Sequence, residues 1–168
     1  PVNTQAPSPA VPSLAPAGSA HDWLGLTNRV CVVTGAAGGI GAEVSRQLVE
    51  AGARVLIAGD GLSALSVLAQ HRVDCVLMDV QMPLMDGLEA TRRIREDSVF
   101  GDLPVIAMTA NARGEDEQSC REAGMNDFIA KPVMPEQFYA KLSQWLAGGP
   151  ANQPSEAAGA SVVPAVAA

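Results

Sequence analysis

The chain has 168 residues, a net charge of −7 and a pI near 4.7, and its densest basic stretch is the pair Arg92-Arg93. This charge balance argues against electrostatic binding of nucleic acid. No apolar run approaches the roughly 18 residues of a membrane-spanning helix and no charged-then-apolar leader is present, so we expect neither a membrane segment nor export.

The two ends of the chain differ in composition from its middle. Residues 1–22 and 148–168 are rich in proline, alanine, serine and glycine and hold few large apolar side chains. We expect a linker and a flexible tail there, which leaves residues 23–147 as one domain. Because the chain begins at Pro1, we also expect it to be a piece of a longer protein.

Apolar runs alternate with helical patterns through the middle of the chain. The apolar runs span residues 29–34, 54–58, 74–79, 103–109 and 127–130. Such continuous runs are typical of parallel strands buried on both faces. Helices are predicted near residues 40–51, 62–70, 87–97, 113–123 and 135–147. The alternation predicts an α/β fold with a doubly wound, five-stranded parallel sheet.

The cysteines indicate the redox compartment. Cys31, Cys75 and Cys120 are far apart in sequence, odd in number and without CxxC spacing. We expect reduced thiols in a cytoplasmic protein, with two of them packed in the core.

A glycine-rich turn follows the first predicted strand. The stretch "VVTGAAGGIG" fits the pattern T-G-x-x-x-G-I-G with Thr34, Gly35, Gly39, Ile40 and Gly41. It is similar to the opening of short-chain dehydrogenases, whose glycines let the backbone approach a pyrophosphate at a helix N-terminus. The resemblance implies a phosphate or nucleotide contact at the three glycines, with Asp60 near the place of a ribose-binding acid.

The rest of a dehydrogenase does not follow this turn. These enzymes are longer and use a Tyr-x-x-x-Lys pair, whereas the single tyrosine here, Tyr139, precedes a lysine at position 141. No Asn-Ala-Gly segment follows the fourth predicted strand. We therefore expect neither dehydrogenase activity nor a nicotinamide cofactor, while nucleotide binding without chemistry stays open as an alternative.

Chemically active side chains stand at the ends of the later strands. Asp79 and Thr109 end the third and fourth predicted strands, and Lys131 follows the fifth. In a doubly wound sheet these ends share one edge, where ligands bind. The sequence therefore predicts a site that combines an aspartate, a hydroxyl and a lysine.

The stretches around these residues carry a second resemblance, which extends over residues 53–147. They are "DCVLMDVQMPLMDG", "VIAMTAN" and "DFIAKP". In this order and spacing they resemble the receiver domains of two-component signalling, and "MPLMDGLEATRRIR" is most similar to receivers attached to hybrid histidine kinases. The resemblance implies a flavodoxin-like (βα)5 receiver architecture and a signalling module rather than a turnover enzyme. It also implies a partner, either a histidine kinase domain or a histidine-containing phosphotransfer domain.

The same resemblance assigns roles to individual residues. Asp79 would attack the phosphorus of a phosphohistidine and become an acyl phosphate, and Lys131 and Thr109 would neutralise the phosphoryl oxygens. Phe128 would be the aromatic switch, turning inward as Thr109 moves toward the phosphoryl group. A cis peptide is expected before Pro132.

One part of the receiver pattern is missing. Receivers hold Mg²⁺ with two acidic residues after the first strand, together with the acceptor aspartate and a backbone carbonyl, which would be those of Asp79 and Gln81 here. The spacing puts Thr34 and Gly35 in the acidic positions, and neither supplies a charged oxygen ligand. Glu43 and Asp60 are poorly placed to substitute. We therefore expect Mg²⁺ binding to be weak or absent.

Three hypotheses follow from these patterns. The first is a receiver of a phosphorelay with Asp79 as phosphoacceptor. The second is a pseudo-receiver that keeps the fold and acts by protein contact without phosphorylation. The third is a nucleotide-binding module that uses the glycine-rich turn and Asp60.

Overall fold

The structure is a computed structural model that describes residues 24–35, 39–111 and 114–147. Its strands are β1 (Val30–Thr34), β2 (Arg54–Ala58), β3 (Cys75–Asp79), β4 (Val105–Thr109) and β5 (Asp127–Ala130). Its helices are α1 (Gly39–Glu50), α2 (Gly61–Gln70), α3 (Gly87–Glu96), α4 (Glu115–Glu122) and α5 (Pro135–Ala147), with a 3₁₀ turn η2 (Ser98–Phe100). The predicted strands and helices are confirmed to within a few residues at their ends. The predicted linker 1–22 and tail 148–168 lie outside the described residues.

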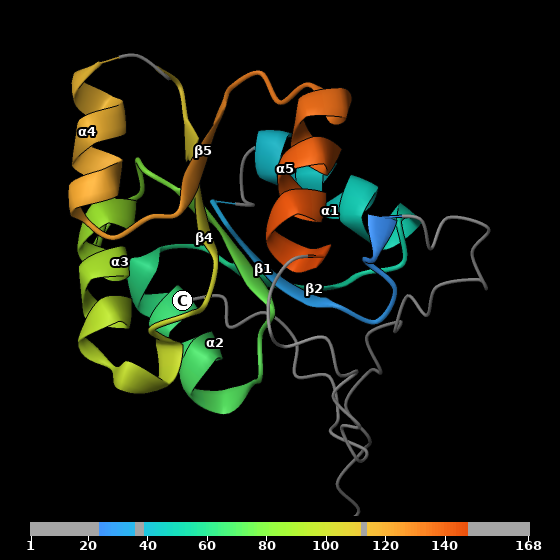
Figure 1. The fold of residues 1–168 in the computed structure, drawn as a ribbon. Helices are drawn as coiled ribbons and strands as arrows, with labels where there is room; N and C mark the ends of the chain where they lie inside the picture. Colours follow the sequence, from blue (N-terminus) through green and yellow to red (C-terminus); the bar gives the residue numbers. More distant parts are fainter. Residues whose placement is uncertain (1–23, 36–38, 112–113, 148–168) are drawn as a thin grey trace, which may run out of the picture.

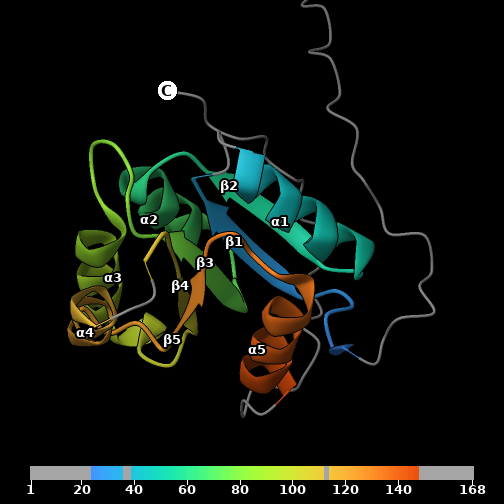
Figure 2. The same cartoon turned by 90° about the horizontal axis from the view of Figure 1, so that it is seen from above.

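All five strands form one parallel sheet in the order β2-β1-β3-β4-β5. Helices α1 and α5 cover one face, and α2, α3 and α4 cover the other (Figures 1 and 2). The predicted doubly wound, flavodoxin-like (βα)5 fold is therefore confirmed. The chain leaves β1 toward β2 on one side and returns to β3 on the other, so the ends of β1 and β3 flank the point where the winding reverses. Ligands bind at such points in open α/β sheets.

The core explains why the strands are continuously apolar. Consecutive strand residues point to opposite faces of a sheet, so Val32 packs under α2 and α3 while Val33 packs under α1 and α5. Met78 and Leu77 divide between the two faces in the same way. Helices cover both faces of β1 and β3, so the inner positions of these strands are apolar on both sides.

The three cysteines are buried and free, in agreement with the expected core packing. Burial raises the pKa of the Cys31 thiol to about 12, and burial also raises the pKa of Cys75. These thiols stay protonated at neutral pH and behave as small apolar side chains. Within the described residues, no helix has the length and apolar character needed to cross a membrane.

Candidate functional site

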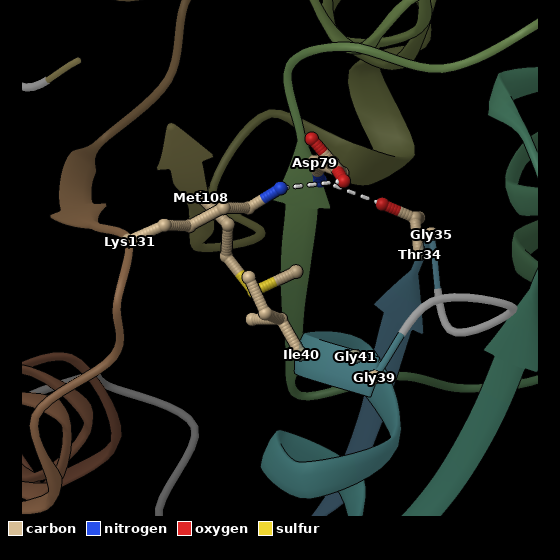
Figure 3. A pocket seen from close by; sticks show the side chains of 8 residues that line it. All are labelled: Thr34, Gly35, Gly39, Ile40, Gly41, Asp79, Met108 and Lys131. Carbon is tan, nitrogen blue, oxygen red and sulfur yellow. Dashed lines mark hydrogen bonds and ion pairs between the residues drawn. The ribbon is translucent and has the colours of Figure 1, made fainter. Parts of the chain in front are cut away.

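Asp79 lies at the carboxyl end of β3, where its carboxylate is held from two directions. Oδ2 accepts a hydrogen bond from Nζ of Lys131 at 2.8 Å, and Oδ1 accepts one from the backbone N–H of Gln81 at 3.1 Å. Lys131 follows β5 and donates its own backbone N–H to the carbonyl of Thr109. The side chains of Asp79 and Lys131 are only 14% and 19% exposed. The structure thus brings together an aspartate and a lysine 52 residues apart (Figure 3).

A cavity of about 140 Å³ opens beside this ion pair. It is lined by Thr34, Gly35, Gly39, Ile40, Gly41, Asp79, Met108 and Lys131 (Figure 3). The glycines predicted from the dehydrogenase-like turn therefore lie in the same pocket as the aspartate and lysine predicted from the receiver-like half. Residues from both stretches of sequence therefore line one cavity.

The last residue of β1 and the residue that follows it, the two positions that lack acids, are closely packed against Asp79. Thr34 is fully buried, and its hydroxyl accepts the backbone N–H of Asp79 at 2.7 Å and donates to the carbonyl of Leu77 at 3.3 Å. Gly35 has φ +66°, a left-handed backbone that favours glycine. A Cβ added to Gly35 would lie 2.7 Å from Oδ2 of Asp79. The carboxylate of Asp79 occupies the space that a side chain at position 35 would need.

Thr109 and Phe128, the two residues of the predicted switch, do not line the described cavity. Thr109 ends β4 at the same edge, but its hydroxyl is hydrogen-bonded to the backbone N–H and carbonyl of Asn111 at 3.1 and 3.0 Å. Thr109 is not among the described residues that line the cavity. Phe128 is half-buried and packs against the apolar cluster under α2, α3 and α4. The ammonium group of Lys141 lies 5.0 Å from the centre of its ring. The roles of Thr109 and Phe128 stay predictions.

The residues present do not fit a magnesium site. No group of three His, Cys, Asp or Glu side chains that could hold a metal occurs among the described residues. Glu43 binds Arg46 on the exposed side of α1, and these hydrogen bonds lower the pKa of the Glu43 carboxyl to about 2. Within the described residues, Asp79 and the backbone carbonyl of Gln81 remain as candidate ligands, and together they supply one carboxylate where the receiver pattern supplies three.

Three residues that bear on the dehydrogenase and nucleotide hypotheses have structural contacts elsewhere. Asp60 is buried and caps α2, where its Oδ1 accepts the backbone N–H of Ser63 at 2.8 Å. Tyr139 donates its hydroxyl to the carbonyl of Gln47, and Lys141 pairs with an aspartate of β5. None of the three lines the described cavity, which is also well below the several hundred Å³ that a nucleotide-sized ligand requires.

Sequence reasoning did not identify the apolar wall of the cavity or the contact made by the Thr34 hydroxyl. Ile40 enters the wall from the first turn of α1, and Met108 enters it from β4. A signal for Met108 exists in the sequence, since it immediately precedes Thr109 at a strand end. The sequence carries no signal for the contact between the Thr34 hydroxyl and the Asp79 amide, because this contact depends on where the hydrogen bonds between β1 and β3 end.

The comparisons with known proteins agree with this geometry. Residues 40–143 match the family model of the response regulator receiver domain. The response regulator DivK of Brucella anthropi is 36% identical over 105 residues, which cover 62% of this chain and 85% of DivK. This chain belongs to the receiver domain family.

Two further relatives describe the context of this receiver. The sensor histidine kinase RcsC of Escherichia coli is 47% identical over 87 residues, which cover 52% of this chain but only 9% of RcsC. The receiver domain of the sensor histidine kinase PA1611 from Pseudomonas aeruginosa superposes with a TM-score of 0.65 and 34% identity, over 72% of this chain and 98% of that one. That structure has a magnesium ion coordinated in its active-site cleft. The present chain is therefore related to receivers of sensor kinases.

Proposed function

We propose that this receiver accepts a phosphoryl group on Asp79 as part of a two-component phosphorelay, within a hybrid histidine kinase. The observation that carries the proposal is the Asp79 carboxylate held beside an open cavity by the ammonium of Lys131 at 2.8 Å. The relationship to RcsC and to the PA1611 receiver supports a sensor-kinase context. The donor would be a phosphohistidine of a kinase domain or of a histidine-containing phosphotransfer domain.

The proposed reaction is an in-line transfer between two side chains. A carboxylate oxygen of Asp79 attacks the phosphorus, and the P–N bond breaks with its electron pair left on the imidazole nitrogen, which takes up a proton. The product is an acyl phosphate on Asp79 and a neutral histidine on the donor. The cavity lies on the open side of the carboxylate and provides room for the phosphoryl oxygens.

The residues of the site have different parts in this reaction. Lys131 supplies the positive charge nearest the attacking oxygen, and the backbone N–H of Gln81 donates to the other oxygen. Thr109 would donate its hydroxyl to the phosphoryl group after it leaves the backbone of Asn111. Phe128 would then respond to the space that Thr109 vacates. The described residues form no cluster that would hold Mg²⁺ during this transfer.

The absent carboxylates support a second candidate, a pseudo-receiver that acts by contact alone. Gly35 offers no ligand, and the described part of the chain contains no metal-binding cluster. Phosphoryl transfer to this chain would then be too slow to matter, while the fold would still present its surface to a kinase or phosphotransfer partner.

Intact mass spectrometry after incubation with acetyl phosphate separates the two candidates. The proposed function predicts a mass gain of one phosphoryl group in the wild type and no gain in Asp79→Asn. A matched control is Asp86→Asn, which changes an exposed aspartate that caps α3. This control should be labelled like the wild type. Absence of label in the wild type, under conditions that label an ordinary receiver, would favour the pseudo-receiver.

A further inference from the structure

The end of β1 does not continue its hydrogen-bonded ladder as far as Asp79. The register between β1 and β3 ends at the pair Val33 and Leu77. Beyond this pair the side chain of Thr34 bridges the two strands, because its hydroxyl accepts the N–H of Asp79 at 2.7 Å and donates to the carbonyl of Leu77 at 3.3 Å. One buried hydroxyl therefore takes the place of a backbone contact next to the acceptor aspartate.

We infer that Thr34 is a positioning residue for Asp79, acting through the backbone from which the carboxylate projects. The remaining anchors hold the carboxylate itself, at Lys131 and at the N–H of Gln81. Thr34 holds the backbone from which that side chain projects, by accepting the N–H of Asp79. Figure 3 shows the hydroxyl and the ammonium reaching Asp79 from opposite sides. The kinetic part of this inference rests on the proposed function.

Gly35 contributes to the position of Asp79 by leaving space for its carboxylate. The Cβ position of Gly35 lies 2.7 Å from Oδ2 of Asp79, closer than real side chains approach. The carboxylate therefore stands where a larger residue would put its side chain. The pair Thr34-Gly35 supplies an anchoring hydroxyl and a space for the carboxylate, where other receivers place acids.

The burial of Thr34 makes its hydroxyl important for this geometry. Thr34 is 0% exposed, so water cannot replace its hydroxyl at the Asp79 amide. A buried donor that loses its partner pays the cost of desolvation, or the backbone moves to recover a bond. A backbone shift displaces the attacking oxygen, and an unpaired amide leaves that oxygen less firmly held; transfer rates are sensitive to such changes in position.

The test compares Thr34→Val, which keeps the branched shape, with Thr34→Ser, which keeps the hydroxyl. Hydrogen exchange followed by NMR on the full chain should be about tenfold faster at the Asp79 amide in Thr34→Val and close to wild type in Thr34→Ser. The amide of Val76, which donates to Pro104 within the same region of the sheet, reports global unfolding. Equal acceleration at residues 76 and 79 would overturn the inference, because it would show a general loss of stability.

The second readout is the initial rate of labelling by acetyl phosphate. We expect a fall of about tenfold in Thr34→Val and recovery in Thr34→Ser. Thr91→Val is the matched control: Thr91 is equally buried, but its hydroxyl donates to the Gly87 carbonyl within α3. This control should be labelled at the wild-type rate. An unchanged rate in Thr34→Val would contradict the positioning role.

The two readouts separate failure of this inference from failure of the proposed function. A wild type that takes no label refutes phosphoryl transfer, and the exchange rate at residue 79 still decides whether Thr34 holds the amide. If Thr34→Val does not fold, Thr34→Ala removes the same hydroxyl with a smaller side chain and is judged by the same two rates.

Discussion

The left-handed backbone at Gly35 gives a direct test of the site at the scale of single residues. Gly35→Ala would place a Cβ against the Asp79 carboxylate and force a non-glycine residue to φ +66°. We expect the free energy of unfolding to fall by about 1–3 kcal/mol, as measured by urea denaturation.

Gly39 provides the matched control in the same cavity. A Cβ at Gly39 meets no atom within 4 Å, and Gly39 begins α1. Gly39→Ala should therefore be neutral or slightly stabilising, since alanine restricts the unfolded chain. Similar destabilisation by both substitutions would contradict the described packing of Gly35 against Asp79.

At the scale of elements, Arg95 joins α3 to the loops before β4 and β5. Its guanidinium donates to the carbonyl of Phe100 at 2.7 Å, to the carbonyl of Gly124 at 2.9 Å and to Oδ1 of Asn126 at 2.7 Å. These bonds come from a rigid fork that no other side chain reproduces. The acceptors belong to two loops, one that holds Phe100 before β4 and one that holds Gly124 and Asn126 before β5.

Arg95→Met should lower the free energy of unfolding by about 2 kcal/mol, because three acceptors lose a charged donor while the apolar stem is kept. The comparison is Arg93→Met, two residues earlier. Arg93 is exposed and pairs with Glu89 on the surface of the same helix, so its loss should change the free energy by about 0.5 kcal/mol or less. Urea denaturation of both variants measures the difference, and equal effects would be inconsistent with the anchoring role.

The contact between β5 and α5 depends on the charge of Asp127. Burial alone would raise the pKa of this carboxyl, but hydrogen bonds from Lys141, Trp145 and the backbone of Phe128 lower it overall. A carboxyl with a lowered pKa in the folded state stabilises the fold at neutral pH. This stabilisation is lost as the pH falls below about 4, through the folded-state value.

Asp127→Asn should therefore destabilise the protein more at pH 7 than at pH 3. Because this carboxylate is partly solvated, we expect the two pH values to differ by no more than about 1 kcal/mol. Urea denaturation at both values measures it, with Glu96→Gln on the exposed end of α3 as control. A cost in Asp127→Asn that is the same at both pH values would show that its ion pair with Lys141 does not stabilise the fold.

At the scale of the whole molecule, ligands that bind only the folded state should raise the melting temperature. Since the described residues do not form a magnesium site, 10 mM Mg²⁺ should stabilise the protein by less than about 0.4 kcal/mol, the value for a dissociation constant equal to the ligand concentration. NAD should likewise have no effect. Differential scanning fluorimetry measures both, with sodium chloride at matched ionic strength as control. A clear rise with Mg²⁺ would require ligands that the described residues do not supply.

The arrangement of the strands was predictable from the sequence, and so was the meeting of Asp79 with Lys131. Both residues stand at the ends of apolar runs, and parallel strands bring such ends to one edge. The contact of Thr34 with the Asp79 amide was not predictable, because it depends on the β1–β3 ladder ending at Val33. The engagement of the Thr109 hydroxyl with Asn111 depends in the same way on the local path of one loop.

The central claim is that Asp79 is the phosphoacceptor of this receiver, and peptide mapping after acetyl phosphate treatment tests it most directly. Borohydride reduces an aspartyl phosphate to homoserine, so the modified residue can be located by the mass of its peptide. The account predicts homoserine at position 79 in the wild type, both with and without EDTA. An unmodified aspartate at position 79, in a protein that remains folded under the conditions used, would contradict it.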